Sequence, residues 1–153
     1  MQKKFDDPAD ILEFAIKREQ KAYDFYLQLK QKVKSKELKD TLHQFAVEEM
    51  GHKKKLEAIV EKTQEYGFTK EEIQNLKIDD YLVEKSPHPD MSYKDLLIIS
   101  INREKKSHLL YMDLEKSVSN PELKQIFANL AQEEASHKLR FELEYDKNIL
   151  PED

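Results

Sequence analysis

Two short segments of the sequence pair a glutamate with a histidine three residues later, a spacing that allows both side chains to bind one metal ion. The segments read EEMGH at residues 48–52 and EEASH at residues 133–137, and they start 85 residues apart. In a helix, residues three apart lie on the same face. One such pair is a weak signal, because it arises by chance in a chain rich in glutamate. The offset therefore has to be tested in the rest of the chain.

The same offset relates four candidate helix starts. Asparagine, aspartate and serine are favoured as N-caps, and proline is favoured as the first helical residue. The caps form two pairs 85 residues apart, Asp7 with Ser92 and Ser35 with Asn120. The sequence therefore predicts two helical hairpins that begin at corresponding positions.

The helix interiors repeat as well. Residues 16–29 read IKREQKAYDFYLQL, and residues 101–114 read INREKKSHLLYMDL. Residues 38–57 and 123–142 align without a gap around the two Glu-x-x-His pairs. We interpret the chain as an internal duplication of a helical hairpin.

Composition limits the fold and the partners of the chain. A length of 153 residues predicts a single domain, residues 1–153. Two glycines indicate a nearly all-α fold, because strand-rich folds need many glycine-bearing turns. The absence of cysteine excludes disulfides and thiolate metal sites. A net charge of −5 argues against nucleic-acid binding, and the longest apolar run, LLII, is too short to span a membrane. We therefore expect a cytoplasmic protein.

The helix signals predict a four-helix bundle. Each half should form an antiparallel hairpin, because its loop is short. Residues 63–91 connect the halves and can cross the length of a helix, with a short helix predicted at residues 69–76. The four long helices are predicted at residues 8–33, 36–62, 93–118 and 121–148.

Each predicted helix has an apolar face that is interrupted near its middle by glutamate. On the first and third helices this residue is Glu19 or Glu104, as far from its hairpin turn as Glu49 or Glu134 is on the facing helix. Antiparallel pairing therefore brings these glutamates and the two histidines to one level. The predicted buried faces of the first and third helices are Leu12, Ile16, Glu19, Tyr23 and Tyr26, and Leu97, Ile101, Glu104, His108 and Tyr111.

A layer of four glutamates inside an apolar bundle requires positive charge, because an isolated buried carboxylate is strongly destabilising. Two divalent cations cancel four carboxylates, while two neutral imidazoles add donor atoms without charge. The alternative is a polar layer that only fixes the helix register, with its glutamates protonated or reaching solvent. The first interpretation predicts a two-metal site with the ligands Glu19, Glu49, His52, Glu104, Glu134 and His137.

This ligand pattern resembles that of the ferritin-like di-iron carboxylate proteins, most closely the rubrerythrin group. The resemblance covers all four predicted helices and implies a ferritin-like bundle of two duplicated hairpins joined by a long crossover. It also implies that Glu49 and Glu134 bridge the metals, while Glu19, Glu104 and the two histidines are terminal ligands. Full-length rubrerythrins carry a cysteine-rich rubredoxin module, and many have a further glutamate where this chain has Ser107.

Three residues near the predicted layer are candidates for a catalytic role. Tyr26 and Tyr111 each follow a ligand glutamate by seven residues, and similar tyrosines hydrogen-bond near the metals in rubrerythrins. The alternative for both is an amphipathic core tyrosine. His108 lies one turn from Glu104, where it is either an extra ligand or proton donor, or a core histidine.

Four other polar residues have weaker signals. Glu48 and Glu133 precede the two bridging candidates, and each either accepts the free ring N–H of the opposite ligand histidine or lies on a solvated face. His43 and His88 have no repeat partner and are expected at the surface.

These features predict a di-iron oxidoreductase. Oxygen and nitrogen ligands with open positions suit iron, with manganese as the other candidate. Two adjacent redox ions can deliver two electrons to hydrogen peroxide or dioxygen. The electrons would come from a separate donor protein, and a homodimer is expected. The alternatives are a ferroxidase or iron-storage protein, and a metal-free helical interaction module.

Overall fold

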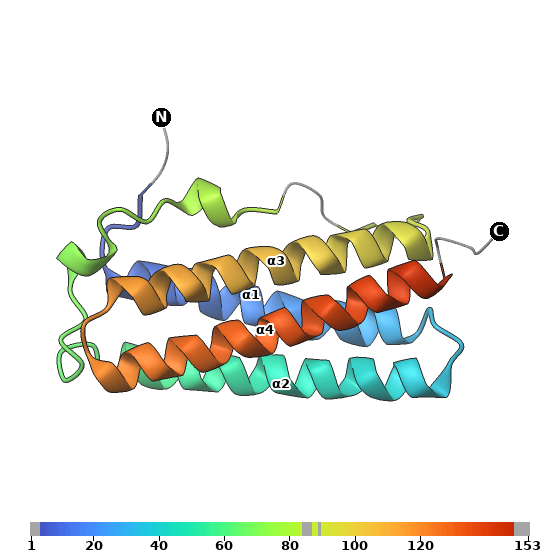
Figure 1. Ribbon diagram of the computed structural model, residues 1–153, viewed down its shortest axis with the longest axis horizontal. Helices are drawn as coiled ribbons and strands as arrows, with labels where there is room; N and C mark the ends of the chain where they lie inside the picture. The colour runs from blue at the N-terminus through green and yellow to red at the C-terminus, as the bar shows by residue number, and fades with distance from the viewer. Residues whose placement is uncertain (1–3, 84–86, 89, 149–153) are drawn as a thin grey trace. The chain divides into compact units, whose positions relative to one another are not determined.

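The computed structural model describes residues 4–83, 87–88 and 90–148. These residues contain helices and no β-strand. The four long helices are labelled in Figure 1. They are α1 (Pro8–Lys30), α2 (Lys36–Val60), α3 (Tyr93–Ser117) and α4 (Pro121–Asn148), with two short 3-10 helices, η1 (Lys70–Ile73) and η2 (Ile78–Tyr81), between α2 and α3.

All four long helices begin at the caps that the sequence predicts. In each case the side-chain oxygen of the cap accepts a hydrogen bond from the backbone N–H three residues later, at 3.0–3.2 Å. This bond satisfies one of the N–H groups that the first helical turn leaves without a partner. The caps are Asp7, Ser35, Ser92 and Asn120.

The C-terminal ends of the first three helices come slightly earlier than predicted. Helix α1 ends at Lys30 instead of residue 33, α2 at Val60 instead of residue 62, and α3 at Ser117 instead of residue 118. After α1 the backbone tightens into three-residue turns, in which Lys32 N–H donates to Leu29 O at 2.9 Å. Apolar periodicity does not detect this change, because Val33 is still buried.

The chain divides into two compact units, which among the described residues are 4–75 and 76–148. Each unit contains one hairpin: α1 packs against α2 in the first, and α3 packs against α4 in the second. The duplication in the sequence is therefore a duplication of the packing unit.

The cores of the two hairpins use the same residue types in exchanged positions. The buried Tyr26 ring packs edge-on against Phe45, with ring centroids 6.4 Å apart. In the second hairpin the buried Tyr111 ring stacks on Phe127, at 6.5 Å. By the repeat offset, Phe127 corresponds to Leu42, so phenylalanine and leucine have changed places by one turn. The exchange conserves core volume, which is the kind of change that cores tolerate best.

The buried faces of α1 and α3 differ from the prediction in the same way. Ile16, Tyr23, Ile101 and His108 were expected in the core, but all four are only half-buried. The residues next to them are buried instead, and all of these are small: Ala15, Ala22, Ser100 and Ser107. A pattern based on large apolar side chains places the stripe one residue off, because alanine and serine contribute little to it.

The connection between the hairpins contains the predicted short helix as η1, and Gly67 adopts a positive φ of 62° in the turn before it. Helix η2 is attached to α3: the buried Tyr81 hydroxyl donates to Asp113 at 2.7 Å. Burial, assisted by the Asp113 carboxylate, raises the pKa of Tyr81 well above its usual range. His43 and His88 are exposed, as predicted. Among the described residues, no helix is long and apolar enough to cross a membrane.

The shifted face of α1 can be tested by overpacking. Ala15 is fully buried, whereas Ala9 on the same helix is exposed. We expect Ala15→Leu to lower the free energy of unfolding by about 1–3 kcal/mol, because the added methylenes must displace packed neighbours. The matched change Ala9→Leu should alter it by no more than about 0.5 kcal/mol. Chemical denaturation of both variants would measure this, and equal effects would contradict the assignment of the buried face.

Candidate metal centre

The first hairpin brings three of the predicted ligands together. Glu19 comes from the middle of α1, and Glu49 and His52 lie on one face of α2. All three are at most 2% exposed. The Nδ1 atom of His52 lies 3.3 Å from Oε2 of Glu19 and 3.3 Å from Oε1 of Glu49. Two carboxylates thus approach the same ring nitrogen.

The second hairpin repeats this arrangement. Glu104 comes from α3, and Glu134 and His137 come from α4. The Nδ1 atom of His137 lies 3.6 Å from Oε2 of Glu104 and 3.6 Å from Oε1 of Glu134. The contacting nitrogen is Nδ1 in both hairpins, so the equivalence between the halves extends to individual atoms.

The spacing of these atoms fits a metal ion better than direct hydrogen bonds. Within each set, one ligand atom from every residue lies within 4.8 Å of the others. Donor atoms bound to one ion at about 2.1 Å are about 3.0–3.4 Å apart at octahedral to tetrahedral angles. A hydrogen bond between nitrogen and a carboxylate would be about 2.7–2.9 Å. The observed distances of 3.3–3.6 Å are close to the first range.

Charge supports the same assignment. Each set has two buried carboxylates and one imidazole. A divalent cation cancels the two negative charges, and a neutral imidazole completes the donors without adding charge. The residues present therefore fit one divalent ion per set, and the oxygen and nitrogen donors suit iron, manganese or zinc.

The structure places two of the three predicted catalytic candidates in the core. Tyr26 and Tyr111 are at most 1% exposed, and both rings pack on phenylalanine. These contacts account for the aromatic rings, and a role for the hydroxyl groups stays a prediction.

The third candidate, His108, is only half-buried and is attached to the neighbouring helix. Its Nδ1 lies 2.8 Å from the backbone oxygen of Ala131 on α4. A carbonyl oxygen can only accept, so Nδ1 carries the proton and Nε2 holds the lone pair in the neutral ring. Among the described residues, His108 is in neither of the metal-capable groups. A catalytic role for His108 remains a prediction, while the bond to α4 is observed.

Glu48 and Glu133 are only half-buried, in contrast to the ligand glutamates beside them. Each lies one position before a predicted bridging glutamate and therefore points about 100° away around the helix. Their role as hydrogen-bond acceptors for a ligand histidine stays a prediction.

Small residues on both sides of the ligand glutamates are a feature that the predicted faces missed. Ala15 and Ala22 lie one turn before and after Glu19, and both are buried. Ser100 and Ser107 hold the same positions around Glu104 and are also buried. The repeat alignment contains this signal, because both pairs are related by the offset of 85 residues.

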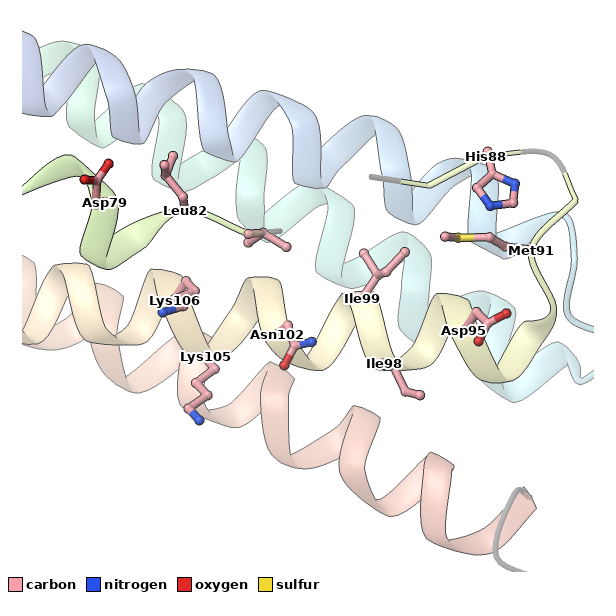
Figure 2. A pocket seen from close by; sticks show the side chains of 11 residues that line it. Asp79, Leu82, His88, Met91, Asp95, Ile98, Ile99, Asn102, Lys105 and Lys106 are labelled. Atoms are coloured by element: carbon pink, nitrogen blue, oxygen red, sulfur yellow. The ribbon is translucent and has the colours of Figure 1, made fainter. Parts of the chain in front are cut away.

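A cavity of about 930 Å³ lies elsewhere in the second unit, between α3 and the segment that precedes it (Figure 2). Apolar side chains such as Leu82, Ile98 and Ile99 line it together with Lys105 and Lys106. None of the six predicted metal ligands contributes to its lining. The cavity is thus separate from the metal-capable sets.

Comparison with solved structures defines the class of fold. A protein from Thermotoga maritima, described provisionally as a ferritin-like diiron-carboxylate protein, matches with a TM-score of 0.77 and 22% identity, over 97% of this chain and 99% of the other. A hypothetical protein from Pyrococcus furiosus matches with a TM-score of 0.69 and 25% identity, over 91% of this chain and 88% of the other. The predicted ferritin-like four-helix fold is therefore confirmed.

The family follows from the sequence comparison. A family model described as Rubrerythrin matches residues 10–88 and 95–150, so the chain belongs to the rubrerythrin family. No significant match was found among curated proteins. Family, fold and the buried glutamate–histidine sets are together compatible with two bound metal ions.

The charge argument predicts that metal stabilises the fold. Metal removal with a chelator should lower the melting temperature, because the carboxylates then lose their counter-charge. At free metal 100-fold above the dissociation constant, each site should contribute about 2.7 kcal/mol. The effect should shrink as pH falls, because protons compete with metal for the ligands.

The control for this experiment is a variant in which apolar residues of similar size replace all six ligands. Its melting temperature should not respond to chelator, and the metal-free variant should be more stable than the metal-free parent. Equal melting temperatures of the parent with and without metal would contradict the assignment.

Proposed function

We propose that this protein is a di-iron oxidoreductase that reduces hydrogen peroxide to water with electrons from a separate donor. The observation that supports it most is the repeated convergence of two buried carboxylates on a histidine Nδ1, at 3.3 Å in one hairpin and 3.6 Å in the other. Membership of the rubrerythrin family favours iron as the metal.

The proposed reaction balances with two electrons and two protons, since hydrogen peroxide, two electrons and two protons give two molecules of water. Iron, when bound, supplies the electrons, because two ions that each change by one electron deliver the required pair. The chain contains no cysteine, so its residues cannot form a thiolate electron-transfer centre. A second protein would therefore return the ions to the reduced state.

The six predicted ligands position the ions and balance their charge. Each set offers three side chains, which is fewer than the six donors of an octahedral ion. The remaining positions would be open to a small oxidant. The ligands are at most 2% exposed, which limits competing reactions with bulk water.

His108 is the proposed source of a proton. Its Nδ1 is held by the Ala131 carbonyl at 2.8 Å, so a proton for transfer would be carried on Nε2 of the doubly protonated ring. The bond to α4 fixes the ring orientation, as a proton donor requires. Tyr26 and Tyr111 are buried on the same helices and are proposed to orient the reactants by hydrogen bonding.

The metal stoichiometry tests the ligand set. Protein loaded with iron in the absence of oxygen should contain about two equivalents per chain. Glu49→Ala should lower this sharply, because the resemblance to rubrerythrins assigns Glu49 to both ions. The matched control Glu57→Ala, an exposed glutamate on the same helix, should retain both. Elemental analysis would measure the content, and two equivalents in Glu49→Ala would show that the shared role is wrong.

The oxidant is tested by stopped-flow oxidation of the reduced protein. We expect hydrogen peroxide to react faster than dioxygen at equal concentration, with one peroxide consumed per two irons. His108→Ala should slow the peroxide reaction without releasing metal, and the loss should depend on pH because the imidazole must be protonated. The control Leu109→Ala changes the next, exposed residue and should react like the parent.

Two outcomes would contradict this proposal. A faster reaction with dioxygen would replace peroxide as the substrate. Ferric mineral that accumulates beyond two irons per chain would favour a ferroxidase or storage function.

A further inference from the structure

The two hairpins have identical ligand types but differ in the residues that flank them. On α1 the ligand Glu19 lies between Ala15 and Ala22, whereas on α3 the ligand Glu104 lies between Ser100 and Ser107. All four flanking residues are at most 7% exposed. The second hairpin thus places two hydroxyl groups where the first has only methyl groups.

The two serines are in different hydrogen-bonding states. The Ser100 hydroxyl donates to the backbone oxygen of Leu96 at 2.9 Å, which is an ordinary bond within a helix. The Ser107 hydroxyl makes no hydrogen bond to any residue within 4–83, 87–88 and 90–148, although the residue is only 6% exposed. A buried hydroxyl without a partner is destabilising, so such groups usually bond a water or a ligand.

The position of Ser107 indicates where this ligand would bind. Ser107 follows Glu104 by three residues on the buried face of α3, and side chains at this spacing are neighbours on a helix surface. Glu104, in turn, belongs to the set that converges on His137 Nδ1. The unused hydroxyl is therefore next to the proposed metal ligands of the second hairpin.

We propose that Ser107 forms a binding site for a small anionic ligand of the metal held by Glu104, Glu134 and His137. The hydroxyl donates a hydrogen bond to a negatively charged atom of the ligand, and such bonds are stronger than those between neutral groups. The first hairpin has Ala22 at this position and lacks the donor. The two metal positions are therefore chemically different, and small anions bind at the second.

This inference rests on the proposed function and deepens it. His108, the proposed proton source, is on the same helix as Ser107 and follows it directly. Peroxide bound on the Glu104 side would thus meet both groups of the second hairpin, while Tyr23 and Ala22 occupy the equivalent positions of the first. The half with Ser107 binds and protonates the oxidant, and the other half only holds a metal ion.

Azide, a small anion that binds ferric iron, is a suitable probe, and its binding does not depend on turnover. Azide would be titrated into the oxidised, iron-loaded full-length protein by absorbance and calorimetry. We expect one tight azide per chain, and Ser107→Ala should raise its dissociation constant by about ten-fold or more through loss of one charge-assisted hydrogen bond. Ser100→Ala is the matched control, because it removes a buried hydroxyl that is already bonded within the helix.

The repeat provides the reciprocal variant. Ala22→Ser adds the hydroxyl to the first hairpin and should create a second tight azide site. In the double variant Ala22→Ser/Ser107→Ala, one tight site should return. Unchanged azide affinity in Ser107→Ala with normal iron content would overturn the inference and leave the proposed function intact. A parent protein that binds no iron would instead overturn the proposed function.

Discussion

Neutralisation of buried carboxylates is the constraint on which the rest of this structure depends. Glu19, Glu49, Glu104 and Glu134 are at most 1% exposed, in a fold whose remaining core is largely aliphatic and aromatic. The penalty for a single unpaired buried charge is several kcal/mol after relaxation, which is a large part of the stability of a domain. Hydrophobic burial along the helices has to hold these groups in place until a cation binds. The long helices, with apolar turns on both sides of the polar level, are well suited to this.

The duplication meets this constraint economically. Each hairpin has two carboxylates and one imidazole, so each balances one divalent ion by itself. Core positions away from the ligands are less restricted, as the exchange of Leu42 and Phe45 for Phe127 and Leu130 illustrates. Volume is conserved across that exchange, but residue identity is not. Identity is preserved where charge and coordination demand it, and only size is preserved where packing does.

Much of the fold could be predicted from the sequence, because its strongest signals are local. The four caps act through hydrogen bonds to residues three positions away, and the repeat confirms each cap by a second copy. Helix ends were less predictable, since the chain after Lys30 stays compact in tight turns without remaining α-helical. The buried faces of α1 and α3 were misplaced by one residue, because Ala15 and Ser100 produce no apolar signal. The convergence on Nδ1 could not be predicted, since it depends on side-chain rotamers and not on spacing.

The misplaced faces also explain where the two halves were able to diverge. A small residue one turn from a ligand glutamate leaves room near the metal, and the size of that room is set by the close packing of the helices. Alanine and serine differ by one oxygen atom, so an exchange such as Ala22 for Ser107 changes hydrogen bonding with little change in volume. Larger changes at these positions would displace the ligand itself. The flanking positions can therefore alter chemistry without altering the fold, whereas the ligand positions cannot. A duplicated site that begins with two equivalent metals can become asymmetric by this route, with one half specialised for binding the substrate.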